Sequence, residues 1–506
     1  MAMSLAWLCR GQLWLCRGQL WLCSVILVTS AICALGQNPP NTNPQPGKAA
    51  PTQTMAPACT VADGFTLAAV GDLIYSEPLA GLADESFQAV VRVLRGADAS
   101  FGNLENTLID LGHFAGYPQA ESGGAHLIGS PALAKDMRAM GFSLVSRANN
   151  HATDWGVEGM RATDEFADAA GLVHAGTGYN RSAARAAHYL QTSKGRVALV
   201  SMATIGGGTP LIGPPMSVSA DPVGRAPGRP GLNALRLTPF YVVPPDIMQA
   251  LHKLHDAQPK AALEFEAQDN RALGITEKQN ELSLFGVNYR LGSDKEIGYA
   301  YEMNERDLRD ILKSIRQGKQ DSDFLVATIH AHEPLNWSEE PPDFLPKLAH
   351  AAIDAGADVF IGHGPHRLKG IEIYNGKPIF YSLGNFFFQQ AIQEPAPADV
   401  YEALRKEPAD VTEHELQSRI LERWFKADVW YQSVVAVSRF EHGQVAEVRL
   451  YPVDLGLTAK GVNQGIPRPA SPAVAKTILE ELQRLSKPYG TLITIEDSVG
   501  VIRVQK

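Results

Sequence analysis

The sequence predicts a layered α/β fold in which sheets are covered by helices. Short apolar runs rich in β-branched residues recur from residue 62 onward, and stretches with apolar residues at helical spacing lie between them. Clusters of Asp, Glu, Asn and His directly follow several of these runs. Alternating strands and helices favour a helix-covered sheet, and polar loops after the strands favour a site at one sheet edge.

The first 36 residues have the composition of a secretory signal peptide or an N-terminal membrane anchor. They contain no acidic residue, two arginines (Arg10 and Arg17), and an apolar run from Leu20 to Leu35. A basic segment, an apolar segment and small residues in this order are typical of export signals. The run is rather short for a membrane span, so we expect an exported protein whose leader is either cleaved or retained as an anchor.

Residues 37–61 are rich in Pro, Asn and Thr and show no periodicity, which predicts an extended linker. Four of the five cysteines lie within the first 33 residues, and Cys59 is the fifth. We therefore expect neither a disulfide framework nor a cysteine-based metal site in the folded part of the chain.

The folded domain is expected over residues 62–458. Six short apolar runs are predicted to be strands: Thr66–Val70, Ser143–Val145, Arg196–Val200, Phe324–Ile329, Val359–Ile361 and Ile379–Tyr381. Apolar residues at i, i+3, i+4 and i+7 predict helices near residues 87–94 and 308–315, and two further helix candidates are Gly156–Ala170 and Leu345–Ala355. Alternating residues at 433–440 and 445–451 predict late antiparallel strands.

Two stretches interrupt this rhythm and are predicted to be insertions. Residues 205–300 are rich in Gly, Pro and polar residues, and residues 390–428 are charged and partly helical. Residues 459–506 are predicted to form a C-terminal helix, with apolar residues at 478, 479, 482 and 485, followed by a β tail.

The composition narrows the function. Of 506 residues, 45% are hydrophobic and 20% are charged, which excludes a disordered chain, a collagen-like chain and a polytopic membrane protein. The net charge of −9 argues against nucleic acid as a partner, because a general nucleic-acid binder needs many phosphate contacts.

Polar clusters at the ends of five strands carry the candidate chemistry. They are Gly71-Asp72, Gly102-Asn103-Leu104-Glu105, Asn149-Asn150-His151, His330 with His332 and Glu333, and Gly362-His363-Gly364-Pro365-His366. Carboxylates, imidazoles and amide oxygens suit Mn, Zn, Fe or Mg. Two divalent ions could clamp the attacking and leaving oxygens of a displacement, while a histidine protonates the leaving group.

Each cluster also has a structural interpretation. Gly71-Asp72 is a common turn, and Asp154 is predicted to cap the helix that starts near Gly156. Arg225, Arg229, Arg236 and Arg290 could meet an acidic polymer or a phosphate, or could be scattered surface residues. The Pro-braced pair His363 and His366 is the strongest single signal for a site.

The ordered set of clusters resembles the CapA/PgsA family of bacterial capsule synthesis proteins. The stretch from Leu368 to Phe386 is also similar to the signature of that family, and the resemblance covers roughly residues 65–390. The family is associated with the synthesis and export of poly-γ-glutamate, and its fold resembles calcineurin-like metallophosphoesterases. The resemblance thus implies a four-layer α/β fold, a β-sandwich flanked by helices.

The resemblance also implies roles for single residues. It makes Asp72 a ligand of a first metal and Glu105 a bridging carboxylate, and it places Asn150 on a second metal. His151 would be the acid that serves the leaving group. The remaining imidazole ligands would be His330, His363 and His366.

Asn103 and the segment Ser382-Leu383-Gly384-Asn385 are expected to position the substrate; the alternative for the segment is a tight turn. The sequence departs from the phosphoesterase pattern, because Asp72 is followed by Leu73 and Ile74 and not by the usual Asp-x-His. One metal position is therefore expected to be weak or filled differently.

The leading hypothesis is an exported, metal-dependent hydrolase of capsule biosynthesis that acts on poly-γ-glutamate, a similar anionic polymer or a phosphoester. One alternative is a non-catalytic extracytoplasmic subunit of a membrane complex that exports polymer. Another is an exported phosphoesterase. All three place the protein in the periplasm or at the outer side of a membrane.

Overall fold

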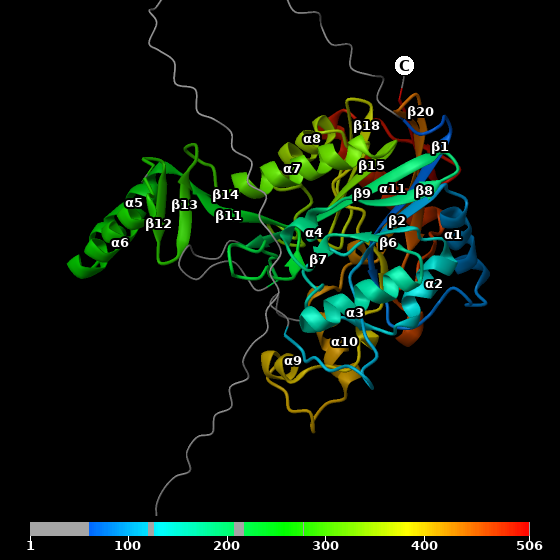
Figure 1. Cartoon of the computed structure of the whole chain (residues 1–506), viewed down its shortest axis with the longest axis horizontal. Helices are drawn as coiled ribbons and strands as arrows, with labels where there is room; N and C mark the ends of the chain where they lie inside the picture. Colours follow the sequence, from blue (N-terminus) through cyan, green and yellow to red (C-terminus); the bar gives the residue numbers. More distant parts are fainter. Residues whose placement is uncertain (1–59, 120–125, 207–216, 277, 505–506) are drawn as a thin grey trace, which may run out of the picture. The chain divides into compact units, whose positions relative to one another are not determined.

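The computed structural model describes residues 60–119, 126–206, 217–276 and 278–504 (Figure 1). The predicted leader (1–36) and nearly all of the predicted linker (37–61) lie outside these residues. In the described part of the chain, no helix combines the length and the apolar character that crossing a bilayer requires.

The first sheet has the strand order β23-β24-β21-β20-β1-β2-β5-β6, with β19 beside β1 and β22 beside β21. Its strands are β1 (Phe65–Ile74), β2 (Ala99–Leu104), β5 (Leu144–Ser146), β6 (Val173–Ala175), β19 (Asn385–Phe388), β20 (Gln432–Glu441), β21 (Gln444–Asp454), β22 (Arg468–Pro469), β23 (Thr494–Glu496) and β24 (Val499–Arg503). Strands β1, β2, β5 and β6 are parallel, whereas β20, β21 and β24 are antiparallel.

The second sheet has the order β12-β13-β11-β9-β15-β16-β18-β17, with β14 beside β11 and β8 beside β9. Its strands are β8 (His188–Thr192), β9 (Gly195–Gly206), β11 (Ala234–Val243), β12 (Glu281–Leu284), β13 (Val287–Leu291), β14 (Gly298–Met303), β15 (Phe324–His330), β16 (Val359–His363), β17 (Ile371–Tyr374) and β18 (Lys377–Phe380). The short pairs β3 (Thr107–Leu108) with β4 (Ile128–Gly129) and β7 (Thr177–Gly178) with β10 (Gly231–Leu232) complete the strands described here.

Helices cover the outer faces of both sheets. The first sheet carries α1 (Glu85–Arg95), α2 (Ala132–Met140) and α3 (Gly156–Ala169), and the second carries α7 (Glu305–Gln320) and α8 (Phe344–Asp354). The other helices are α4 (Arg181–Arg185), α5 (Pro245–Asp256), α6 (Lys260–Leu273), α9 (Ala398–Ala403), α10 (Glu413–Trp424) and α11 (Pro472–Ser486).

Side chains of the central strands point alternately to the core between the two sheets and to the core beneath the helices. In β1, Leu67 and Ala69 join the core between the two sheets, whereas Ala68 and Val70 join the core beneath the helices. Strand β15 repeats this pattern, because alternate side chains of a strand point to opposite faces. The predicted sandwich of two sheets flanked by helices is therefore confirmed.

Local signals explain the helices that were predicted from periodicity. In α1, the Asp84 side chain accepts hydrogen bonds from the backbone N–H groups of Ser86 and Phe87, which caps the helix. The predicted apolar stripe of α1 is buried, and so is Ile311 together with Ile315 on α7. One face of each helix is thus fixed on a sheet.

The segments outside the regular alternation contribute to the same body. The predicted insertion at 205–300 supplies β11–β14, and β11 pairs with β9 of the second sheet. The segment 390–428 forms α9 and α10, which have a small apolar cluster of their own. In the C-terminal segment, Ile478, Leu479 and Leu482 of α11 belong to the core between the sheets, and β24 pairs with β21.

We predict that Phe324→Ala destabilises the fold by about 3–5 kcal/mol, because it opens a cavity between the two sheets. The ring of Phe324 lies 5.0 Å from that of Phe65 and 4.7 Å from that of Phe440. Chemical denaturation measures the change. Phe265→Ala, at a side chain that is 67% exposed, is the control and should change stability by less than about 0.5 kcal/mol. Equal effects of the two substitutions would contradict this account of the core.

Candidate metal centre

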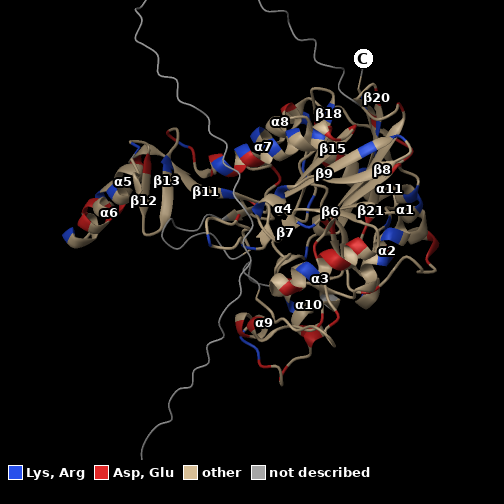
Figure 2. Ribbon diagram, viewed as in Figure 1, with Lys and Arg blue, Asp and Glu red and all other residues tan. Residues whose placement is uncertain are grey.

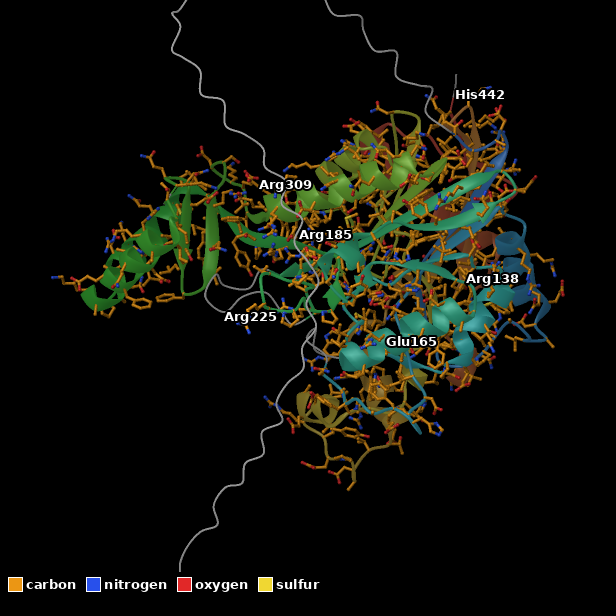
Figure 3. All side chains as sticks on the ribbon, viewed as in Figure 1. Arg138, Glu165, Arg185, Arg225, Arg309 and His442 are labelled. Atoms are coloured by element: carbon orange, nitrogen blue, oxygen red, sulfur yellow. The ribbon has the colours of Figure 1, made fainter. Side chains whose placement is uncertain are left out.

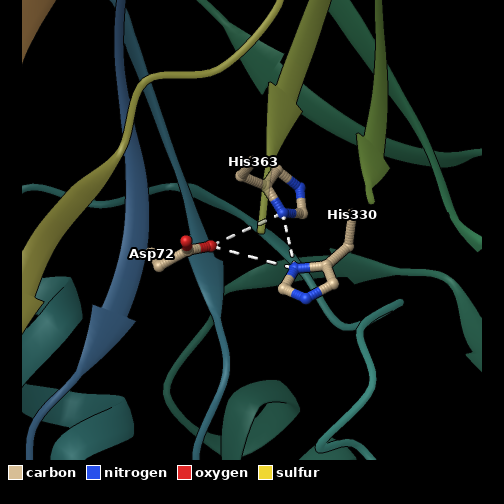
Figure 4. A group of neighbouring side chains, drawn as sticks. All are labelled: Asp72, His330 and His363. Carbon is tan, nitrogen blue, oxygen red and sulfur yellow. Dashed lines mark hydrogen bonds and ion pairs between the residues drawn. The ribbon is translucent and has the colours of Figure 1, made fainter. Parts of the chain in front are cut away.

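The carboxyl ends of parallel strands from both sheets meet at one place. Asp72 on β1 is in register with Asn103 on β2, and His330 at the end of β15 is in register with His363 on β16. All four side chains are buried. Figure 4 shows Asp72 facing the two imidazoles. The prediction that these clusters share one sheet edge thus holds for the strands of both sheets.

Glycine brings Asp72 into this position. Gly71 and Asp72 lie inside β1 at an irregularity of the register, so the alternative of a turn is wrong. A Cβ atom on Gly71 would lie 1.8 Å from the carbonyl oxygen of Gly384, so only glycine allows this approach. The Asp72 carboxylate accepts hydrogen bonds from Asn103 Nδ2 (2.8 Å) and from the backbone N–H of Gly364 (3.2 Å).

Three imidazoles form a row beside Asp72. His330 Nδ1 lies 3.0 Å from His363 Nδ1, and His330 Nε2 lies 2.9 Å from His332 Nε2. His363 Nδ1 and His330 Nδ1 lie 3.6 and 3.8 Å from Asp72 Oδ1. The row joins the end of β15 to the end of β16.

The outer partners of the row determine where its protons lie. His363 Nε2 lies 2.8 Å from Thr328 Oγ1, whose hydroxyl donates to the carbonyl of Ile361, so His363 Nε2 is the donor. His332 Nδ1 lies 2.7 Å from Asn336 Oδ1, with which it can only act as a donor. In a neutral ring, these bonds leave a lone pair on His363 Nδ1 and on His332 Nε2, and both lone pairs face His330.

Burial keeps these rings neutral. Desolvation and the charges of neighbouring histidines hold the pKa of His330 well below its ordinary value. Burial lowers the pKa of His332 and of His363 to about 4. A neutral His330 has one N–H, but each of its two ring nitrogens faces a lone pair, on His363 or on His332. At least one of these two nitrogen–nitrogen contacts therefore has no hydrogen between its atoms. A cation that accepts lone pairs would satisfy this arrangement.

A second carboxylate extends the group. Glu105 is fully buried, and its Oε1 has no hydrogen-bond partner within the described residues; this atom lies 3.9 Å from His330 Nε2 and 3.8 Å from His151 Nε2. Burial and the charge of Asp72 raise the pKa of Glu105 well above its ordinary value. Burial also acts to raise the pKa of Asp72, but the hydrogen bond and charge of His366 outweigh it and lower that pKa.

Three sets of side chains offer ligand atoms within 4.8 Å of one another in the described parts of the chain. They are Asp72 with His330 and His363, Glu105 with His330 and His332, and Asp72 with Glu105 and His366. Asn150 Oδ1 is also buried without a hydrogen-bond partner among the described residues. Carboxylate, imidazole and amide oxygen are a donor set that fits a divalent metal.

His151 has a fixed orientation at the side of this group. Its Nδ1 lies 2.7 Å from Asp154 Oδ2, and that oxygen also accepts the backbone N–H of Leu127. The prediction that Asp154 caps α3 is wrong, because the cap position is Trp155 and no side chain caps this helix. In the sequence, Asp154 resembles a helix cap because a helix follows it. In the structure, it instead pairs with His151, three residues earlier.

Asn103 and Asn385, which were predicted to position the substrate, form hydrogen bonds with other residues of the site. Asn103 Nδ2 bonds Asp72, and its Oδ1 accepts a hydrogen bond from Asn149 Nδ2 at 3.1 Å. Asn385 Oδ1 lies 2.9 Å from His366 Nδ1, and Asn385 Nδ2 donates to the backbone carbonyl of His366. These contacts orient Asp72 and His366, and His366 adopts a left-handed backbone conformation with φ of 58°.

His332 belongs to the centre, although its place after the predicted end of a strand made it a weaker candidate than His330. The side chains of residues i and i+2 share a face only while a strand continues, and β15 ends at His330. The loop after β15 nevertheless brings the two rings together, with centroids 4.8 Å apart. A His-x-His pair at the end of a buried strand was the available signal.

The fold and the buried centre define a class of protein. Two sheets pack face to face between helices, and buried carboxylates and imidazoles meet at the strand ends, as in calcineurin-like metallophosphoesterases. The family model described as "Bacterial capsule synthesis protein PGA_cap" matches residues 66–390, and the chain belongs to this family.

Curated relatives agree with this membership. An uncharacterized protein of Sinorhizobium fredii, y4sH, is 48% identical over 461 residues, covering 89% of this chain and 95% of that protein. The PGA biosynthesis protein CapA of Bacillus subtilis is 30% identical over 309 residues, which are 61% of this chain and 58% of that protein. The capsule biosynthesis protein CapA of Bacillus anthracis is 24% identical, covering 64% of this chain and 60% of that protein.

We predict that the metal-free protein loses stability as the pH falls from about 6.5 to about 4. His363 has a folded pKa of about 4, whereas an unfolded histidine has a pKa near 6.5. Between these values the unfolded chain binds a proton that the folded chain excludes, so unfolding becomes more favourable at lower pH. At pH 5 the contribution of His363 alone is about 2 kcal/mol relative to pH 7.5, and the lowered pKa values of His330 and His332 add to it.

Thermal unfolding of EDTA-treated protein at both pH values tests this. His363→Gln should reduce the pH dependence by the share of His363, while His330 and His332 keep the rest. His442→Asn, at a side chain that is 71% exposed, should leave it unchanged. Identical pH slopes for the wild type and His363→Gln would refute the assignment.

Proposed function

We propose that the chain is an exported, metal-dependent hydrolase that acts on poly-γ-glutamate or a similar anionic polymer during capsule synthesis. Two Bacillus relatives carry names that refer to PGA or capsule biosynthesis. The predicted leader at residues 1–36 supports export, and a membrane-bound capsule-synthesis complex is the proposed neighbour.

The observation that carries this proposal is the row of His332, His330 and His363, in which at least one pair of facing ring nitrogens has no hydrogen between them. Lone pairs converge in it next to two buried carboxyl groups, and an ionised carboxylate in such a place needs compensating charge or hydrogen bonds. A structural role for these residues would favour rings with complementary donors and acceptors.

The proposed ligands combine these donor sets with the roles that the family resemblance implies. Asp72, His363 and His366 would hold a first divalent ion, and Glu105 would bridge it to a second one held by Asn150. His330 lies between the two carboxylates and can serve either position. Such ions supply Lewis acidity at the scissile carbonyl or phosphoryl group and lower the pKa of water.

The protein residues would handle the leaving group. Asp154 holds Nδ1–H of His151, so Nε2 faces Glu105 Oε1 at 3.8 Å. A protonated His151 can donate from Nε2 to a departing amine or alkoxide, with Asp154 stabilising the imidazolium. Asn103 and Asn385 fix Asp72 and His366, which keeps the reacting groups aligned.

We predict that His363→Ala and Asp72→Ala remove bound metal. Each deletes a donor from a set whose remaining atoms cannot complete the coordination. Elemental analysis after Mn or Zn supplementation measures the metal per chain, and His442→Asn is the control on an exposed histidine (Figure 3). Wild-type protein that binds no metal would contradict the proposed function.

We predict that His151→Ala retains metal but lowers the rate of γ-glutamyl hydrolysis by roughly 10²-fold or more, because it removes the proton donor. The appearance of new amino groups on poly-γ-glutamate measures the rate. His113→Ala is a matched control, because His113 pairs with Asp110 at 2.7 Å on the surface with the same three-residue separation. If metal-loaded wild-type protein does not hydrolyse this polymer, the result would instead support the non-catalytic export subunit. Turnover only on phosphate esters would support the exported phosphoesterase.

A further inference from the structure

Beside the metal centre lies a group of four arginines: Arg181 and Arg185 of α4, Arg236 of β11 and Arg306 of α7. Arg185, labelled in Figure 3, pairs with Asp307 in the first turn of α7. Elsewhere, as along α5 and α6, basic and acidic residues are intermixed (Figure 2). A concentration of guanidinium groups is unexpected in a chain with a net charge of −9.

The topology places this group at the edge of the second sheet that carries the metal centre. Ala203 of β9 pairs with His330 on one side and with Ala234 of β11 on the other. Ala234 is thus two strand spacings, about 10 Å, from His330. From there β11 runs beyond the end of β15, which carries Arg236 past the rim of the centre.

Direct contacts tie the arginines to this edge. Arg185 Nε donates to Asn233 Oδ1 at 3.1 Å, and the Asn233 carbonyl accepts the backbone N–H of Ala203. Asn233 therefore connects the arginine group to the strand that neighbours His330.

The available carboxylates do not neutralise the group. Asp307 is shared by Arg185 (2.7 Å) and Arg236 (2.6 Å), and Asp310 bonds Arg185 at 2.9 Å. Arg306 reaches Asp310 only at 3.9 Å.

Arg181 is the least compensated of the four. It donates from Nε to the carbonyl of Ser219 and forms no ion pair with any described residue. Asp221 accepts the backbone N–H of Ser182, and the charge of Arg181 helps to lower the pKa of this carboxylate. Burial and the like charges of Arg185, Arg236 and Arg306 lower the pKa of Arg181, while Asp307 acts in the opposite direction.

Two arginines named in the sequence analysis have partners outside this group. Arg290 pairs with Glu281 at 2.9 Å and lies over the ring of Phe240, so it is a structural residue of the β11–β14 segment. Arg229 donates from Nε to the carbonyl of Val218. Within the group of four, Arg181 and Arg306 are the guanidinium groups with the least compensation, and they are available to a ligand.

We propose that Arg181 and Arg306, beside the ion-pair network of Arg185, Arg236 and Asp307, form a subsite that binds carboxylates of an anionic polymer near the metal centre. This inference rests on the proposed function for its choice of polymer. Guanidinium binds carboxylate through paired hydrogen bonds, and a site about two strands from the metal would grip a chain outside the bond being cleaved. The subsite does not require the metal.

Fluorescence anisotropy of a labelled γ-linked glutamate decamer, titrated with EDTA-treated full-length protein at low salt, tests the subsite. We expect Arg181→Gln/Arg306→Gln to weaken binding about fivefold, because each exposed charge contact contributes modestly. Added salt should weaken the wild-type complex, since screening acts on exposed charges. Arg306→Gln alone, at an exposed position, should give part of the loss without any change in the melting temperature.

The matched control is Lys313→Gln/Arg316→Gln, which removes two exposed charges from the same helix, α7. Equal weakening by both double variants, or no binding by the wild type, would overturn the subsite. The subsite would also be overturned if polyphosphate bound through the same arginines while the glutamate decamer did not bind. Because the assay contains no metal, a failure of the metal centre leaves its result unaffected.

Discussion

The burial of two carboxylates, Asp72 and Glu105, is the constraint on which the rest of the structure depends. An ionised carboxylate removed from water needs compensating charge or hydrogen bonds. Asp72 has Asn103, the Gly364 amide and nearby imidazoles, but Glu105 Oε1 lacks a hydrogen-bond partner in the described part of the chain. Divalent cations among these side chains would compensate both carboxylates and use the converging lone pairs.

The architecture makes this convergence possible. Parallel strands of both sheets end at the same edge, so residues more than 250 positions apart, such as Asp72 and His330, come within 4 Å. The core between the sheets keeps this edge rigid. The polar network of Asn103, Asn149 and Asn385 then fixes the side chains, a form of preorganisation that binding and catalysis both need.

Much of this could be predicted from the sequence. The strands and helices with clear periodicity, such as β15 and α1, lie within a few residues of their predicted ranges, since burial on one face leaves a regular pattern. The strand-end clusters also identified Asp72, Glu105, His330 and His363 as neighbours. These patterns lie within short segments of the chain, and the same segments form the corresponding strands, helices and strand ends in the structure.

Other features depend on tertiary contacts and left no local pattern. Asp154 looks like a helix cap in the sequence, but its carboxylate is drawn to His151 and the Leu127 amide. Gly71 looks like a turn residue, yet the approach of Gly384 is what requires it. Of the arginine group, only Arg236 was among the sequence candidates for an acidic polymer. Arg181 and Arg306 left no signal, because they join it only when α4, β11 and α7 pack.

Anomalous diffraction at the metal absorption edge, on crystals of the full chain grown with Zn²⁺ or Mn²⁺, tests the central claim most directly. The account predicts an anomalous peak at about 2.0–2.3 Å from a carboxylate oxygen of Asp72 and a ring nitrogen of His363. A second peak should lie beside Glu105. Metal that binds only at other sites, with no peak among these buried side chains, would contradict the account.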